Sequence, residues 1–142
     1  MSKELPLNDP RIYMGALDRQ VGGEHYKDGR GGIQPVEFIE RNGLPFCMGN
    51  VIKYLYRWKL KGGKVDLDKA IHYCELAMSM YRPCVADSDD TWEVRPDEFI
   101  RSNKLSLTEA RVVNELCAVY TDGLQAYLRA YELLKTLAKG WE

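Results

Sequence analysis

A run of basic residues near the middle of the chain is the feature that most directly suggests chemistry. Between Phe46 and Lys64 there is no acidic residue, and the bases there are Lys53, Arg57, Lys59, Lys61 and Lys64. If the segment is helical, one side of it carries Asn50, Lys53, Tyr54, Arg57 and Lys61. Cations three or four residues apart repel each other by roughly 0.2–0.5 kcal/mol per pair, so this face predicts an anionic partner such as a phosphate group. The alternatives are a solvated basic face, or one paired with the acidic residues from Asp87 to Asp90.

A glycine-rich stretch upstream supplies further polar side chains. Residues 22–32 hold His25, Tyr26, Lys27 and Arg30 among several glycines, and glycine-rich backbone can present N–H groups to phosphate oxygens. The stretch matches neither a Walker A loop nor a dinucleotide-binding fingerprint. The alternative role for His25 and Tyr26 is to attach this arm to the helices that follow.

Carboxylates offer a different chemistry. Glu37 and Glu40, together with Asp66 and Asp68 downstream, could hold Mg²⁺ as paired carboxylates do in helical nucleotide pyrophosphatases. The downstream pair lacks the helical ExxD spacing of that family, and Asp66 is explained more simply as a helix N-cap. No metal site made of protein ligands is therefore predicted.

The elements that must position these residues are helical, because apolar residues recur every three or four positions in the longer segments. We expect a loop-rich arm over 1–34, followed by helices over 35–41, over 46–61 and from the N-cap Asp66 to about Tyr81. An acidic surface loop over 83–95 and a short helix over 96–101 come next. A long helical stretch then runs from a capping box at Ser106 to about Lys139, and Asp122-Gly123 could kink or split it. The predicted fold is mainly α: helical hairpins with a glycine-rich N-terminal arm and no P-loop α/β core. Residues 1–142 form one domain, divided into the arm (1–34), a core with a helical hairpin (35–82), the acidic loop (83–95) and a C-terminal helical unit (96–142).

The sequence also repeats itself at an offset of 61 residues. The matching positions are Pro35, Glu37, Phe38, Ile39, Asn42 and Leu44 with Pro96, Glu98, Phe99, Ile100, Asn103 and Leu105. This predicts two copies of a unit made of a short helix and a hairpin, although the shared segment is also a common way to begin a helix. The basic cluster occurs in the first copy.

Composition narrows the functional classes. The 142 residues are 45% apolar and 29% charged, which suits a compact globular domain, and the net charge of −1 gives no general attraction to nucleic acid or anionic membranes. Sequence-specific DNA binding is not expected. No apolar run approaches the length of a membrane span, so a cytoplasmic location is expected. Cys47, Cys74, Cys84 and Cys117 form no CxxC pair and are expected to be reduced core thiols.

Several blocks between Gly22 and Met80 occur in a specific order. They are His25-Tyr26-Lys27, Gln34-Pro35-Val36-Glu37-Phe38-Ile39, Gly49-Asn50-Val51-Ile52-Lys53-Tyr54 with Arg57, Lys61-Gly62, and Asp66-Leu67-x-Lys69-Ala70. In these blocks the chain resembles a small phage-encoded family related to the early deoxynucleoside monophosphate kinase of a lytic coliphage. That relative phosphorylates nucleotides such as dTMP and dGMP without a P-loop and assembles into a large homo-oligomer. Residues 83–142 match no block of the family, so the resemblance covers less than half of the chain.

The resemblance implies a kinase that transfers a phosphoryl group from ATP or another nucleoside triphosphate to a deoxynucleoside monophosphate. Its catalytic residues would be His25, Lys53 and Arg57, and its nucleotide-binding residues Tyr26, Asn50, Tyr54 and Lys61. The glycine-rich arm and the helix start after it add Lys27, Arg30 and Gln34 as further candidate nucleotide-binding residues. Phosphoryl transfer depends mainly on positioning and charge neutralisation, so Lys53 and Arg57 would form an electrostatic clamp. Mg²⁺ would arrive with the triphosphate.

The expected partners are nucleotides and further copies of the chain. A periodic helix as long as the C-terminal one usually needs a partner surface, which predicts a homo-oligomer through the C-terminal helices. If the chain is phage-encoded, its location is the host cytoplasm. The alternative function is a non-catalytic nucleotide-binding or host-interaction module of a phage, because nothing in the sequence identifies a general base with a matched partner.

Overall fold

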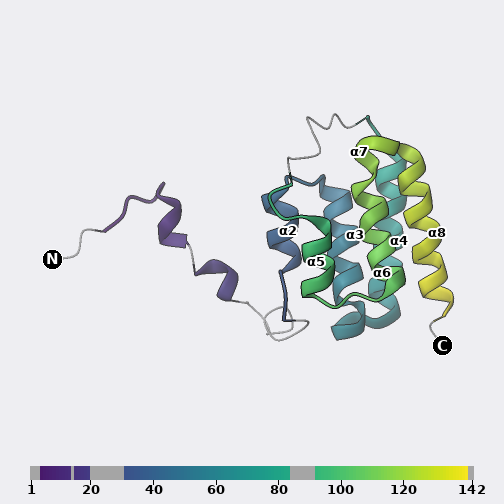
Figure 1. The fold of residues 1–142 in the computed structure, drawn as a ribbon, viewed down its shortest axis with the longest axis horizontal. Helices are drawn as coiled ribbons and strands as arrows, with labels where there is room; N and C mark the ends of the chain where they lie inside the picture. The colour runs from purple at the N-terminus through teal and green to yellow at the C-terminus, as the bar shows by residue number, and fades with distance from the viewer. Residues whose placement is uncertain (1–3, 14, 20–30, 84–91, 141–142) are drawn as a thin grey trace.

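The computed structural model describes residues 4–13, 15–19, 31–83 and 92–140, and within them every regular element is helical. The helices are η1 (Pro10–Tyr13), η2 (Ala16–Asp18), α2 (Pro35–Arg41), α3 (Phe46–Arg57), η3 (Trp58–Gly62), α4 (Gly63–Ser79), α5 (Pro96–Ser102), α6 (Leu107–Cys117), α7 (Val119–Asp122) and α8 (Leu124–Lys139). η1 and η2 are 3₁₀ helices and η3 is a π-helix. The predicted mainly α fold is confirmed. The long helices α3, α4, α6 and α8 lie side by side, and the short helices α2 and α5 cover one flank (Figure 1).

The two short helices form where the sequence predicts them. α2 has the predicted bounds, and α5 runs one residue further than expected. Each begins with a proline, whose fixed φ and missing N–H suit the first helical position. Each turns a phenylalanine inward: the rings of Phe38 and Phe99 stack with centroids 4.5 Å apart. This contact joins the two halves of the chain.

The first hairpin departs from prediction at its turn. A single helix was expected over 46–61, but α3 ends at Arg57 and continues as the π-helix η3. The Gly63 N–H donates to the carbonyl oxygen of Trp58, five residues back, which is the π-helical pattern. The predicted N-cap role of Asp66 is wrong, because α4 already begins at Gly63 and Asp66 lies buried in its first turn.

The second hairpin replaces the predicted long helix. The capping box at Ser106 is confirmed: its Oγ accepts from the Glu109 N–H at 3.2 Å, and Glu109 Oε1 accepts from the Ser106 N–H at 2.8 Å. The helical stretch then splits at Gly123, where φ is +66°, a conformation that glycine adopts without a Cβ clash. α8 therefore folds back along α6 (Figure 1). The expectation of a homo-oligomer assumed one long helix, so it loses this support and stays a prediction.

The two halves have equivalent structures, in agreement with the predicted repeat. We call α2, α3, η3 and α4 the first unit and α5 to α8 the second unit. Each hairpin turns at a glycine of nearly the same conformation, Gly63 (φ 56°, ψ −143°) and Gly123 (φ 66°, ψ −142°). Asn42 Nδ2 donates to the carbonyl oxygen of Val94 at 2.8 Å, and Asn103 Nδ2 donates to that of Ile33 at 2.8 Å. Such reciprocal contacts indicate an approximate two-fold relation between the units.

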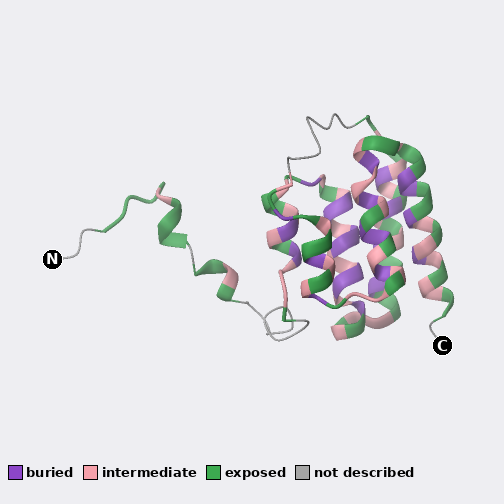
Figure 2. Cartoon of the chain, in the orientation of Figure 1, coloured by how far each residue is buried: buried purple, intermediate pink, exposed green. Residues whose placement is uncertain are grey.

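The core lies between the four long helices (Figure 2). α3 packs against α4, α4 against α8, and α8 against α6. The most deeply buried apolar side chains of α3 and α6 are Met48, Val51, Ile52, Leu55, Val112, Val113 and Leu116. Truncating a leucine in such a core typically costs about 2–5 kcal/mol of stability. Among the described residues, no helix is both long and apolar enough to cross a membrane.

Candidate functional site

The buried side of α3 determines which of its side chains face outward. Because Val51, Ile52 and Leu55 are at most 1% exposed, the opposite side of the helix carries Lys53, Tyr54 and Arg57. α4 runs beside this face and contributes Lys69 and Tyr73. The basic face predicted from the spacing therefore exists, and a second helix completes it.

Three cations converge on the ring of Tyr54. The Nζ atoms of Lys53 and Lys69 lie 4.9 and 5.3 Å from the ring centroid, and the Arg57 Cζ lies 5.6 Å from it. The Tyr73 ring stacks nearby, at 5.9 Å and 15°. Each cation–π contact is worth about 0.5–1 kcal/mol at an exposed site. We call Lys53, Tyr54, Arg57 and Lys69 the Tyr54 cluster.

One buried carboxylate holds the arginine of this cluster. Arg57 Nε donates to Asp66 Oδ2 at 2.8 Å, and Asp66 is 1% exposed. Gly62 makes room for the carboxylate, because a Cβ atom on residue 62 would overlap the Asp66 carboxyl group. Asp66 therefore acts as a positioning residue for Arg57. Sequence reasoning missed this role, although the Gly62-Gly63 pair between the two residues signals a turn that brings them together.

Besides Arg57, two more of the five bases in the run pair with acids. Lys59 Nζ lies 3.6 Å from Glu109 Oε1, and Lys64 Nζ lies 3.4 Å from Asp68 Oδ2. Trp58 Nε1 also donates to Glu109, at 2.8 Å. The fully buried Glu109 of the second unit thus anchors η3, which in turn places Arg57 and Gly62. The predicted pairing with Asp87–Asp90 lies outside the described residues.

The remaining predicted site residues divide into two groups. Asn50 lies one turn before Tyr54 on α3, where its Nδ2 donates to the Phe46 carbonyl oxygen at 2.9 Å. Lys61 lies on η3 and is exposed. Gln34 occupies the N-cap position of α2 without a capping side-chain hydrogen bond, and its Nε2 donates to the carbonyl oxygen of Leu17 at 2.5 Å. The other predicted residues, His25, Tyr26, Lys27 and Arg30, lie outside the described residues.

A groove of about 390 Å³ lies beside the Tyr54 cluster, between α2 and α3. Its lining residues are Gln34, Pro35, Val36, Ile39, Glu40 and Lys53. Lys53 therefore belongs both to the groove and to the cluster. Sequence reasoning did not predict this groove, because it depends on how closely the two helices approach.

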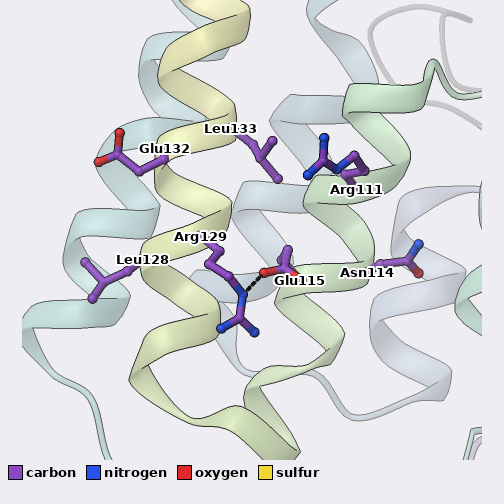
Figure 3. A pocket seen from close by; sticks show the side chains of 7 residues that line it. All are labelled: Arg111, Asn114, Glu115, Leu128, Arg129, Glu132 and Leu133. Carbon is purple, nitrogen blue, oxygen red and sulfur yellow. Dashed lines mark hydrogen bonds and ion pairs between the residues drawn. The ribbon is translucent and has the colours of Figure 1, made fainter.

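A second cavity, of about 450 Å³, lies between α6 and α8 in the second unit (Figure 3). Its lining residues are Arg111, Asn114, Glu115, Leu128, Arg129, Glu132 and Leu133. Arg129 forms ion pairs with Glu115 and Asp122. The repeat offset places Asn114 and Glu115 where the first unit has Lys53 and Tyr54. This cavity is thus the counterpart of the Tyr54 cluster, with the cations of the first unit partly replaced by an ion pair.

Three of the four carboxylates considered for magnesium, Glu37, Asp66 and Asp68, are paired with cations. Glu37 accepts from Arg41 Nε at 2.9 Å, and Asp66 accepts from Arg57. Over residues 4–13, 15–19, 31–83 and 92–140, no three His, Cys, Asp or Glu side chains are placed to share a metal ion. Cys47, Cys74 and Cys117 are free thiols, whereas Cys84 is not among the described residues.

Comparison with known proteins adds one match. Residues 21–75 match DUF3310, a family described as proteins of unknown function. The search of curated proteins and the search of solved structures returned no match. The matched segment includes α2, α3, η3 and most of α4, so it contains the whole Tyr54 cluster. The second unit lies outside it.

Proposed function

We propose that this protein is a phage-type nucleotide kinase that transfers a phosphoryl group from ATP or another nucleoside triphosphate to a deoxynucleoside monophosphate of the dTMP or dGMP class. The observation that carries the proposal is the convergence of Lys53, Arg57 and Lys69 on one tyrosine ring. These side chains bring three positive charges, which Asp66 offsets by one. A polyphosphate would balance the remainder.

The chemistry of phosphoryl transfer suits such a cluster. Charge spreads over the oxygens of the transferring group in the transition state, and catalysis consists largely of positioning and electrostatic stabilisation. Arg57 is oriented in advance by Asp66, so less side-chain entropy is lost when its guanidinium meets a phosphate. Lys53 and Lys69 reach the same region from two different helices.

The ring of Tyr54 serves here mainly as a platform for cations. Lysine and arginine groups cover it, and Tyr73 stacks close by. Base stacking on Tyr54, which the sequence allows, is therefore not part of the proposal. Mg²⁺ would be held by phosphate oxygens and water, as is usual when the ion arrives with a nucleotide.

Two further properties belong to the proposal. Self-association is supported by large apolar side chains that are exposed at equivalent first-turn positions of the two units, Phe46 (75%) and Leu107 (78%). Light scattering on the purified chain tests it. A location in the cytoplasm of a phage-infected host follows from the resemblance and is tested by fractionation of infected cells.

The test of the proposed function is a turnover assay with a matched control. The full chain is incubated with Mg²⁺, ATP and each deoxynucleoside monophosphate in turn, and diphosphate products are separated by ion-exchange chromatography. Lys69→Ala should lower the rate by about tenfold or more, because a charge-assisted hydrogen bond to phosphate is worth about 1.5–3 kcal/mol. The control is Lys135→Ala, because Lys135 lies over the Tyr131 ring of α8 at 4.6 Å in the second unit.

Three results contradict or redirect the proposal. Equal loss in the two lysine variants would show that the Tyr54 cluster has no special role. Nucleotide binding by calorimetry without any product would favour the non-catalytic binding module. The absence of both binding and product with every nucleotide would overturn the proposal.

A further inference from the structure

We infer that the groove between α2 and α3 binds the nucleoside part of a nucleotide whose phosphates lie on the Tyr54 cluster. This inference rests on the proposed function and extends it, because it assigns the nucleoside of the acceptor to a groove of which the sequence indicated only Gln34 and Lys53. The occupant is a nucleoside monophosphate rather than a peptide or a second copy of the chain.

The size and lining of the groove suit a base and a sugar. Its volume of about 390 Å³ lies within the range of about 300–1,000 Å³ typical of small-molecule sites, which combine apolar walls with a few polar groups. Pro35, Val36 and Ile39 supply the apolar walls, and Val36 is 56% exposed. Glu40 and Gln34 supply hydrogen-bonding groups for the edge of a base or a sugar hydroxyl.

Lys53 connects the groove with the Tyr54 cluster. Its side chain lines the groove, and its Nζ lies 4.9 Å from the centroid of the Tyr54 ring. A nucleotide needs this combination, an apolar slot next to a concentration of positive charge. The carboxylate of Glu40 would repel a phosphate, whereas the ammonium group of Lys53 would attract it. The charges therefore favour one orientation, with the phosphate toward Lys53.

The groove is also well supported by the surrounding structure. At Gly49 a Cβ atom would lie 2.9 Å from the Ile39 Cγ2, so the glycine lets α2 pack closely on α3. The far end of α2 is held by Asn42, whose side chain bonds to both Phe38 and Val94. A site formed before the ligand arrives loses less conformational entropy on binding.

The cavity between α6 and α8 is the rival location. It is larger, but its Arg129 is already paired with Glu115 and Asp122. A further carboxylate, that of Glu132, lines it as well (Figure 3). Its charges therefore offset one another, and it offers a phosphate less attraction than the Tyr54 cluster does.

The experiment fills each cavity in turn. Val36→Trp places a large ring in the α2–α3 groove, and Leu128→Trp does the same in the α6–α8 cavity; both residues are exposed, at 56% and 40%, so neither change disturbs the core. Calorimetry on the full chain then measures the dissociation constants of dTMP, dGMP and inorganic tripolyphosphate. Val36→Trp should weaken the monophosphates by about tenfold or more and leave tripolyphosphate unchanged. Leu128→Trp should change neither.

Each outcome decides the inference. Selective loss of monophosphate binding in Val36→Trp supports it. Unchanged monophosphate binding in that variant overturns the assignment of the groove as the nucleoside site and does not affect the proposed function. Equal loss of both ligands in Val36→Trp, or selective loss in Leu128→Trp, also overturns it. If the wild-type chain binds neither monophosphate nor tripolyphosphate, the proposed function fails together with the inference.

Discussion

The hairpin of α3 and α4 and the hairpin of α6 and α8 differ most on the faces that point away from the core. Where α3 carries Lys53 and Tyr54, α6 carries Asn114 and Glu115 at the equivalent positions. The Tyr54 ring collects cations in the first unit, whereas Glu115 forms an ion pair with Arg129 in the second. The first unit therefore concentrates positive charge and the second neutralises it.

The buried faces differ much less. Val51, Ile52 and Leu55 of α3 correspond in sequence to Val112, Val113 and Leu116 of α6, and all six are at most 1% exposed. Dense packing restricts what a buried position can accept, whereas an outer position tolerates changes in charge. The comparison shows that the two units share one helical arrangement. The first unit carries the candidate site, and the second packs against it and stabilises it.

The turns of the two hairpins show the same division. Gly63 lies 17 positions after the first residue of α3, whereas Gly123 lies 16 positions after the first residue of α6. The extra residue is accommodated in the π-helix: Gly63 N–H bonds to a carbonyl five residues back, whereas Gly123 N–H bonds to that of Val119, four residues back. π-Helical turns occur frequently at functional sites. Here the turn follows Arg57 directly and provides the close approach of Gly62 to Asp66.

The largest expected effect concerns the thiols in the two units. Burial raises the pKa of Cys74 in α4 and of Cys117 in α6 to about 12. At pH 8 the thiolate fraction of each should therefore be about a thousandfold lower than for an exposed cysteine, with reactivity rising only as the pH approaches 12. Alkylation by iodoacetamide, followed by mass spectrometry, measures both rates, and the unfolded chain is the control. Cys74 is buried whereas Cys117 is partly exposed, so faster reaction of Cys74 than of Cys117 would show that the first core opens and would break the comparison.

The next effect comes from giving the first unit the surface of the second. The double variant Lys53→Asn, Tyr54→Glu should weaken tripolyphosphate binding by about a hundredfold, because it removes one cation, adds one anion and deletes the aromatic platform. The reciprocal double variant, Asn114→Lys with Glu115→Tyr, should not weaken tripolyphosphate binding, because it leaves the Tyr54 cluster intact and adds positive charge to the second unit. Similar effects of the two double variants on binding would mean that the units do not differ in function.

A buried pair provides the third prediction. Arg57→Ala should lower phosphate binding by about tenfold or more and the free energy of unfolding by about 3 kcal/mol, because it leaves the Asp66 carboxylate buried without its partner. The double variant Arg57→Ala, Asp66→Ala should recover most of the stability and none of the binding. It reproduces the second unit, which has Ala118 at the position of Arg57. After the extra residue of the π-helix the offset is 60, so Ala126 stands at the position of Asp66. Urea unfolding and calorimetry measure the two quantities, and a fully stable single variant would disprove the positioning role of Asp66.

The smallest effect distinguishes the two reciprocal asparagines. The Asn42 Oδ1 accepts from the backbone N–H groups of Glu93 and Val94, whereas within the described part of the chain the Asn103 Oδ1 has no hydrogen-bond partner. Asn42→Ala should therefore cost about 1 kcal/mol more stability than Asn103→Ala. Urea unfolding of the two variants checks the order, and equal losses would indicate that the two contacts between units are equivalent after all.

Features that depend on a few neighbouring residues were predictable. The bounds of α2 followed from Pro35 at its start and Asn42-Gly43 at its end, and the beginning of α6 followed from the capping box of Ser106 and Glu109. The basic face of α3 followed from helical spacing alone. Each of these depends on interactions within one or two turns of helix, which local sequence specifies directly.

Features that depend on how the chain folds back on itself could not be predicted from the sequence. Asp66 was expected to cap a helix because it is a good N-cap residue, but the π-turn starts α4 three residues earlier and carries Asp66 into the interior beside Arg57. Lys69 was part of a recognisable block, yet its approach to the Tyr54 ring depends on the packing of α4 against α3.

By itself, the sequence determined that the chain is helical and that one helix carries a face of a single charge sign, and it indicated that the two halves are related. Only the tertiary structure decided that a second helix adds a cation to this face, that Asp66 holds Arg57, and that a groove opens beside Lys53. The physical reason is the separation in sequence between the residues that interact. Helix starts, ends and faces depend on residues a few positions apart, whereas ion pairs and grooves between helices depend on turns whose hydrogen-bond register a single residue can shift.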